Sequence, residues 1–202
     1  RLPRSWRGRR VARRMGPFPE DGMGDGEHRD ERSDEQLWAA FVAGQDEALP
    51  ALERRYRREL YWYLLLSTGK QDAAARALRS TWALLAGWRG AFAGFGSFRT
   101  WLYAVATQNT TPATRPETFG LTDLLDDLKR TERTTERARL FFRVVDIDRA
   151  LRQPFLLATL AGLSVEDAAL VCNFSVERTR HCLARAYRTM ARLRRREAAG
   201  TP

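Results

Sequence analysis

Arginines recur on one side of a predicted helix near the end of the chain. They are Arg178, Arg185, Arg188, Arg192 and Arg195, and their separations place them on a common helical face. Guanidinium groups neutralise DNA phosphates, and those near a helix start can pair with guanine edges in the major groove. Apolar and small side chains recur in the same way on a different face: Val176, Thr179, Leu183, Ala186, Met190 and Leu193. The spacing therefore predicts a helix that packs on one face and binds DNA with the other.

The alternative is that these arginines only form a solvated surface. Glu177 is the one acidic residue set against eight arginines between positions 178 and 196. Like charges at these spacings destabilise an isolated helix. DNA binding is therefore the preferred interpretation.

A shorter predicted helix precedes the basic one. Ser164 and Asp167 form a start signal like a capping box, and Ser175 can cap the basic helix. Asn173 between them tolerates the left-handed backbone of a tight turn. A short helix, a tight turn and a basic helix make a helix-turn-helix, whose second helix enters the major groove. The expected DNA contacts are Arg178, Thr179, Arg180, His181, Arg185 and Arg188.

Cys172, His181 and Cys182 raise the alternative of a metal site. His181 and Cys182 are adjacent, so they point about a hundred degrees apart on a helix. A structural zinc site needs four ligands, and no fourth lies nearby. We therefore expect Cys172 to be a small core residue and expect no metal. The sequence shows no nucleophile–base–acid set and no phosphate-binding glycine loop, so we expect neither an enzyme nor a cofactor.

The first half of the chain also has a helical pattern. Ser33 with Gln36 predicts a capping box, and Gly44 predicts the end of that helix. Pro50 suits a first helical position. Further helices are predicted over about 72–88 and from Ser97, on either side of a glycine-aromatic loop at 90–96. No segment alternates with a period of two for long, so the fold class is all-α.

The domain organisation follows from two breaks in this pattern. Residues 1–33 carry an arginine block and then an acidic, glycine-containing block, which predicts a disordered tail. The arginine block could be a nucleic-acid arm, a plain tail, or translated sequence ahead of a start at Met15. Residues 110–137, with Pro112 and Pro116, predict a flexible linker with one short helix at 121–130. Two small helical domains are expected, at 34–109 and 138–197.

Composition limits the class of protein further. The 202 residues have a net charge of +10 and a pI near 10.6, which favours a polyanionic partner. No run of eighteen apolar residues exists, so no membrane insertion is expected. The start of the sequence has no apolar core with a cleavage site, and we expect no secretory signal. Two cysteines cannot form a disulfide framework, which fits a reducing cytoplasm.

Two segments resemble the extracytoplasmic-function (ECF) sigma factors of bacterial RNA polymerase. The run Gly96-Ser97-Phe98-Arg99-Thr100-Trp101-Leu102-Tyr103 is similar to a run in the family's first domain. Thr81, Trp82 and Trp88 fit the family's clamp-docking helix. Gly162-Leu163-Ser164 precedes the short helix as it does in the family, and the pattern of Val176, Arg180, Leu183, Arg185 and Ala186 is similar to the recognition helix. The resemblance covers about 34–109 and 146–194.

This resemblance implies a promoter-specificity subunit that itself catalyses nothing. The first domain would bind core RNA polymerase and open the −10 element, and the second would read the −35 element of promoter DNA. By this resemblance, the single-stranded −10 contacts are Phe95, Ser97, Arg99 and Asn109, and the polymerase contacts are Arg76, Arg79, Thr81, Trp82 and Leu85. An anti-sigma factor is a further implied partner. For Trp101 and Leu102 a plain core role is preferred.

The chain also departs from the family pattern. Ala75-Arg76 and Arg79-Ser80 stand where the family has an acidic pair and a glutamine–glutamate pair. Each close charge pair lost would cost ~1.5 kcal/mol or more of polymerase affinity. Thr110-Thr111-Pro112 should end a helix that the family continues. The alternative function is thus a sigma-like regulator that does not initiate transcription: a decoy for an anti-sigma factor or a stand-alone DNA-binding protein.

Overall fold

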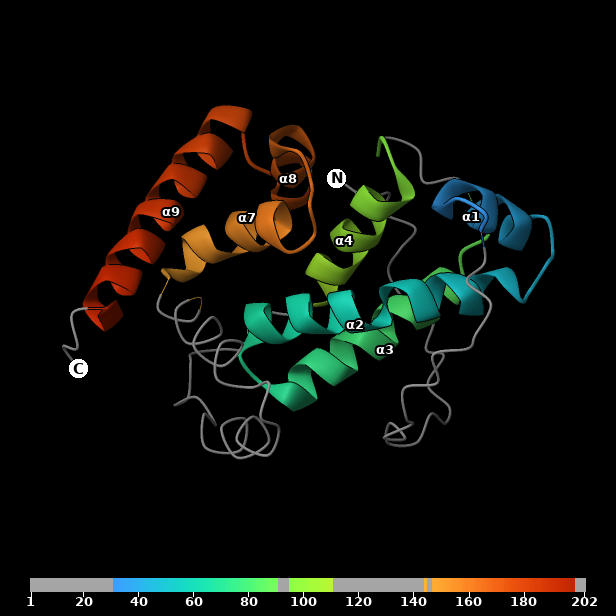
Figure 1. The fold of residues 1–202 in the computed structure, drawn as a ribbon. Coiled ribbons are helices and arrows are strands. Elements are labelled where there is room, and N and C mark those ends of the chain that lie inside the picture. The colour runs from blue at the N-terminus through green and yellow to red at the C-terminus, as the bar shows by residue number, and fades with distance from the viewer. Residues whose placement is uncertain (1–30, 91–94, 111–143, 145–146, 199–202) are drawn as a thin grey trace. The chain divides into compact units, whose positions relative to one another are not determined.

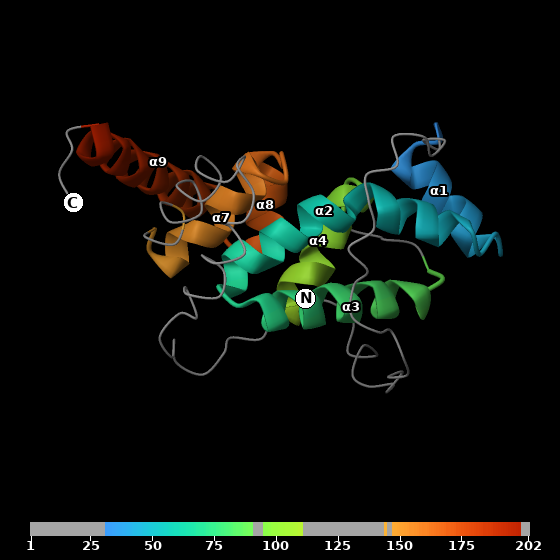
Figure 2. The ribbon, with the colours of Figure 1, turned by 60° about the horizontal axis from the view of Figure 1, so that its bottom comes forward.

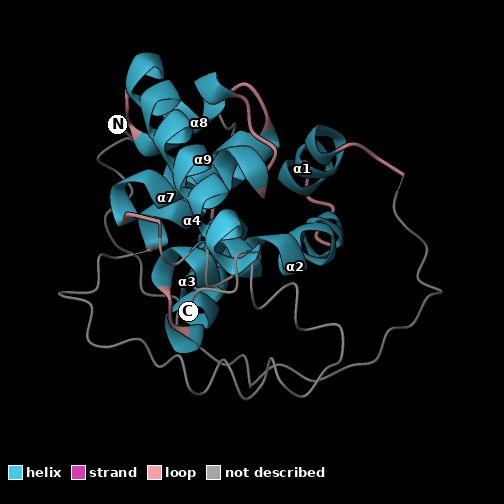
Figure 3. Cartoon of the chain, turned by 60° about the vertical axis from the view of Figure 1, so that its left-hand side comes forward, coloured by secondary structure: helices cyan, strands magenta, loops and turns pink. Residues whose placement is uncertain are grey.

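The computed structural model describes residues 31–90, 95–110, 144 and 147–198. Every regular element within these ranges is a helix, as Figure 3 shows, and the predicted all-α class is confirmed. The chain divides into one unit at 1–31 and another at 32–202. The helices below all belong to the second unit, and none of them is long and apolar enough to span a membrane.

The first four helices are α1 (Asp34–Val42), α2 (Ala48–Thr68), α3 (Gln71–Ala86) and α4 (Phe98–Asn109). Ser33 and Gln36 form the predicted capping box, and the Ser97 hydroxyl accepts a hydrogen bond from the Thr100 amide. α2 starts two residues before Pro50, which therefore lies in its first turn rather than at its first position. α2 and α3 lie side by side (Figures 1 and 2), and α2 reverses into α3 through Gly69 at φ 72°.

An aromatic cluster forms the core between α1 and α4. The rings of Trp38 and Trp101 meet edge to face with centroids 4.9 Å apart, and Phe98 packs against both. Trp101 is 2% exposed and Leu102 is fully buried. The preferred core role of Trp101 and Leu102 is therefore confirmed.

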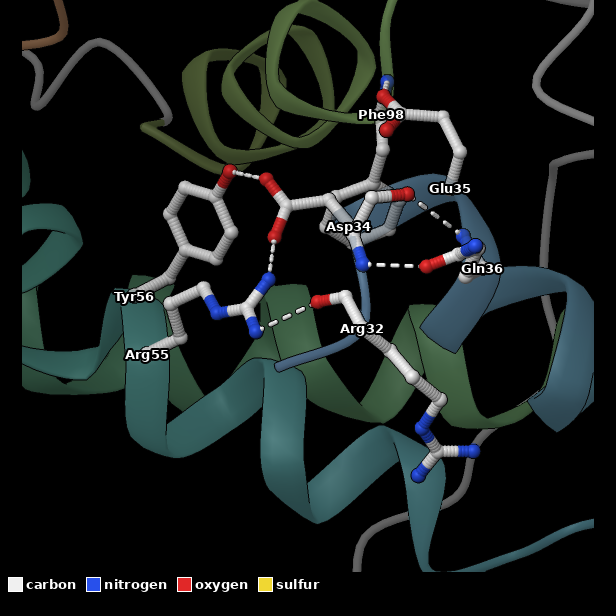
Figure 4. A network of polar contacts seen from close by, with 8 residues as sticks. Arg32, Asp34, Glu35, Gln36, Arg55, Tyr56 and Phe98 are labelled. Carbon is white, nitrogen blue, oxygen red and sulfur yellow. Dashed lines mark hydrogen bonds and ion pairs between the residues drawn. The ribbon is translucent and has the colours of Figure 1, made fainter. Parts of the chain in front are cut away.

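Polar contacts fix the start of α1 against α2 and α4 (Figure 4). The Asp34 carboxylate accepts hydrogen bonds from the Tyr56 hydroxyl and the Arg55 guanidinium. Arg55 also donates to the carbonyl of Arg32 at 2.9 Å. The Glu35 carboxylate accepts from the backbone amide of Phe98, the first residue of α4, at 3.3 Å. Glu35 thus satisfies an amide that no helical carbonyl can reach.

The last three helices are α7 (Arg149–Thr159), α8 (Val165–Cys172) and α9 (Val176–Ala198), and α9 packs on α7 and α8 (Figure 1). Ser164 caps α8 by accepting from the Asp167 amide, and Ser175 accepts from the Arg178 amide at 3.1 Å. Asn173 adopts the predicted left-handed conformation, with φ 54° and ψ 45°. The start signals and the turn residue were thus predicted correctly.

The predicted domain boundaries remain predictions. Most of the predicted tail and of the linker, with its short helix at 121–130, lies outside the described residues. Within the second unit, α4 contacts α8 and α2 contacts α7. The Arg99 guanidinium donates to the carbonyl of Ala161, ahead of α8, at 2.7 Å. The helices α1–α4 therefore contact the helices α7–α9 in this structure.

Candidate nucleic-acid interface

The two predicted faces of α9 are both present. Thr179, Leu183, Ala186 and Met190 are buried against the neighbouring helices. These residues recur every three or four positions, which is the period of a helix that packs on one side. The packing fixes the orientation of α9 and leaves its opposite side open to solvent.

The open side carries six basic or titratable residues, which we name the arginine stripe: Arg178, His181, Arg185, Arg188, Arg192 and Arg195. All six are exposed, and successive members are three or four residues apart. At 1.5 Å per residue the stripe is about 26 Å long. Among the described residues, none of its arginines pairs with a carboxylate. The stripe is thus a surface of net positive charge.

A cavity of about 250 Å³ opens beside the stripe. Its lining comprises Asp148, Leu151, Arg185, Arg188, Thr189 and Arg192. Three guanidinium groups face one carboxylate there, so the net charge of the lining is positive. A backbone phosphate of bound DNA would find several donors at this place.

The expected DNA contacts do not all lie on this surface. Arg178, Arg180, His181, Arg185 and Arg188 are exposed. Thr179 is 0% exposed, and its hydroxyl donates to the carbonyl of Ser175 at 3.0 Å. It is therefore a core residue of α9 and not a surface residue. Arg180 lies off the stripe and pairs with Glu166 of α8 at 3.2 Å.

Three of the four residues expected to meet single-stranded DNA make polar contacts within the protein. Arg99 pairs with Glu59 of α2, which also accepts a hydrogen bond from Tyr103 at 2.6 Å. Asn109 donates to Thr81 at 3.2 Å, and Ser97 caps α4. Phe95 is half-buried. No sequence pattern pointed to Glu59, because a single glutamate that follows four arginines in α2 resembles a solvated face.

Burial of three tyrosines predicts a loss of stability in alkaline solution. Burial raises the pKa of Tyr63 to about 12, and burial together with a neighbouring carboxylate raises the pKa of Tyr56 and Tyr103 above the ordinary value of 10. The folded state therefore keeps protons that the unfolded chain releases, so the stabilisation is complete below pH 10 and declines above it. The free energy of unfolding should fall by about 1 kcal/mol per pH unit per tyrosine between pH 10 and 12.

Chemical denaturation at pH 9, 10, 11 and 12 measures this decline, with Tyr103→Phe as the matched variant. Tyr103→Phe should show a shallower decline than the unaltered protein. Equal slopes, or constant stability up to pH 12, would contradict the prediction.

Of the residues expected to contact polymerase, two are exposed and three are buried. Arg76 and Arg79 are exposed on α3. Thr81, Trp82 and Leu85 are buried in the helical core, and the Thr81 hydroxyl donates to the carbonyl of Ala77 at 2.8 Å. In this structure these three side chains are buried, with Trp82 7% exposed, whereas the side chains of the two arginines are exposed.

Cys172 is half-buried and Cys182 is buried. Burial raises the pKa of the Cys172 thiol to about 12, so the thiol is protonated at neutral pH. Within the described ranges, no three histidine, cysteine, aspartate or glutamate side chains gather in a metal-binding arrangement.

Known proteins resemble this chain in sequence and in fold. No family model matches the chain. The ECF RNA polymerase sigma factor SigM of Mycobacterium tuberculosis, from strains H37Rv and Erdman, is 29% identical over 192 residues. The match covers 89% of this chain and 92% of SigM. CnrH, solved in complex with the cytosolic domain of CnrY, has a similar fold. Its TM-score is 0.57 at 19% identity, over 79% of this chain and 96% of CnrH.

Three observations agree: the run from Gly96 to Tyr103, the exposed basic face of α9, and a match that extends over nearly the full length of both sequences. The resemblance deduced from the sequence is confirmed: over most of its length the chain is similar to an ECF sigma factor.

Proposed function

We propose that the chain is an ECF-type sigma factor that binds core RNA polymerase and promoter DNA to direct transcription initiation. The observation that carries this proposal is the arginine stripe, which is exposed, regular and unpaired within the described residues. The similarity to SigM supplies the biological class. The +10 net charge agrees with an electrostatic attraction to DNA.

The geometry of α9 suggests how duplex DNA would be bound. The first turns of a recognition helix enter the major groove, where Arg178 and His181 would face base edges. The later members, Arg188, Arg192 and Arg195, would then lie along the phosphate backbone. Side-chain bonds to carbonyls of the same helix, from Arg188 to Ala184 and from Arg195 to Ala191, hold two of these arginines along the helix surface.

Single-stranded −10 DNA would require a change of partners in the first four helices. Phe95 and Ser97 stand at the start of α4, where an unpaired base could stack or accept a hydrogen bond. Arg99 can reach DNA only after leaving Glu59 and the carbonyl of Ala161. We propose that DNA phosphates replace these acceptors during promoter opening.

Two protein partners belong to the proposal. Core polymerase would dock on the outward side of α3, which presents Arg76 and Arg79. An anti-sigma factor would hold the protein inactive, and CnrH, which shares the fold, was solved bound to the cytosolic domain of CnrY.

A second candidate function is a sigma-like regulator that does not initiate transcription. It is favoured by the exposed Arg76 and Arg79, which replace residues that are acidic or polar in the family pattern. α4 also ends at Asn109, as the Thr110-Thr111-Pro112 segment predicted. Such a protein would keep DNA binding by α9 and lose polymerase binding.

Gel filtration of the full chain with core polymerase at low salt distinguishes the two candidates. We expect co-elution of a stoichiometric complex. A chain that binds duplex DNA but elutes apart from polymerase would support the second candidate instead.

Replacing Arg76 with aspartate tests the docking surface. The substitution restores an acidic group where the family pattern has one, so polymerase affinity should rise about tenfold or more, as expected for a close charge pair of ~1.5 kcal/mol. Arg54→Asp, at an exposed position on α2, is the control for the change in net charge. Weaker association of the Arg76 variant alone would indicate a different docking surface.

A further inference from the structure

The turn before α9 brings an aromatic ring beneath an arginine of the stripe. The guanidinium carbon of Arg178 lies over the ring of Phe174, 3.9 Å from the ring centroid. Phe174 follows the left-handed Asn173, and its amide donates to the carbonyl of Ala169 at 2.9 Å. Its side chain is half-buried. The turn thus holds the backbone of Phe174 in place, while Arg178 remains exposed to solvent.

Contact through the face of a guanidinium differs from contact through its edge. All five N–H groups of arginine point outward in the guanidinium plane, so a ring against the face leaves them free. Arg180 differs, because an N–H group at the edge of its guanidinium pairs with the Glu166 carboxylate at 3.2 Å. Within the described part of the chain, the side-chain donors of Arg178 make no hydrogen bond, so this arginine in the first turns of α9 has donors that are oriented and available.

We infer that Phe174 is a positioning residue for sequence recognition, holding Arg178 ready to donate two hydrogen bonds to one guanine. This inference rests on the proposed DNA binding by α9. A free arginine side chain gives up rotational freedom when it binds, and the ring removes part of that freedom beforehand. The cation–π contact is expected to contribute to base discrimination and little to the attraction of phosphates, which does not depend on the direction of the donors.

The test uses the full chain and a duplex obtained from it by in vitro selection. Each guanine of the selected site is changed in turn, and the ratio of dissociation constants measures discrimination. Arg178→Ala should lower this ratio at one guanine by about five- to 100-fold. Phe174→Ala should lower it at the same guanine by about two- to fivefold, and Phe174→Tyr, which keeps the ring, should not. Affinity for a scrambled duplex should change less than twofold in both Phe174 variants.

A double-mutant comparison separates positioning from a purely structural role. If Phe174 acts through Arg178, adding Phe174→Ala to Arg178→Ala leaves discrimination unchanged. A further loss in that background, or equal weakening on selected and scrambled duplexes, would overturn the inference. In the free protein, Phe174→Ala should also remove the upfield ring-current shift of the Arg178 δ protons. Absence of that shift in the unaltered chain would overturn the inference whatever the DNA result.

Failure of the proposed function has a different signature. A chain that shows the ring-current shift but selects no sequence would contradict sequence recognition by α9, and Phe174 would then have nothing to position.

Discussion

Replacing Arg185, Arg188, Arg192 and Arg195 together with alanine should lower the affinity for duplex DNA on the order of 10³-fold near 0.1 M salt. Each arginine that meets a phosphate releases a counterion, and the four contributions add because the residues lie along one exposed face. The slope of log K against log salt should become shallower by about one for each arginine removed. α9 itself should not weaken, because alanine favours helix and the repulsion between like charges is relieved.

A matched variant carries the same loss of charge elsewhere. Arg54, Arg58, Arg76 and Arg79 are exposed on α2 and α3, so their joint replacement with alanine changes the net charge equally. Fluorescence anisotropy with a labelled duplex over a salt series compares the two proteins. If both variants lose the same affinity, net charge and not the arginine stripe governs binding, and the assignment of α9 as the DNA-binding helix is wrong.

Replacing Trp101 with alanine should lower the free energy of unfolding by about 3–5 kcal/mol. The indole is 2% exposed and packs against Trp38 and Phe98, so its removal leaves a cavity at the junction of α1 and α4. Losses of this size take up much of the stability of an ordinary domain. Urea denaturation followed by circular dichroism measures the change.

Leu84→Ala is the control for this prediction, because Leu84 is 38% exposed on α3 and should cost less than about 0.5 kcal/mol. A Trp101→Ala protein with unaltered stability and impaired binding of single-stranded DNA would contradict the core-packing role of Trp101. Trp101 would then be a base-stacking residue.

The sequence predicted helix starts well because their signals are local. Ser33, Ser97, Ser164 and Ser175 each accept a hydrogen bond from the amide three residues later, as a capping side chain does. Asn173 was predictable for the same reason, since its left-handed conformation depends on its own side chain and not on distant contacts. The faces of α9 followed from periodicity alone.

The partners of individual side chains were not predictable in this way. Arg99 was expected to face DNA, but Glu59 lies forty residues earlier and Ala161 lies sixty-two residues later, and only tertiary packing brings them together. Thr81 was expected on a docking surface, yet the helix buries it completely. Family resemblance indicates which helix is expected to contact DNA or polymerase, whereas the direction of each side chain depends on packing. Thr179 was assigned to both faces of α9, and its burial decides for the core.

Run-off transcription with core polymerase and a library of genomic fragments tests the central claim most directly. If the chain is a sigma factor whose α9 reads duplex DNA, adding it to core polymerase should produce discrete transcripts that share an upstream sequence, and the fourfold arginine-to-alanine variant of α9 should abolish them. Transcripts no different from those of core polymerase alone, from a chain that still binds duplex DNA tightly, would contradict the claim.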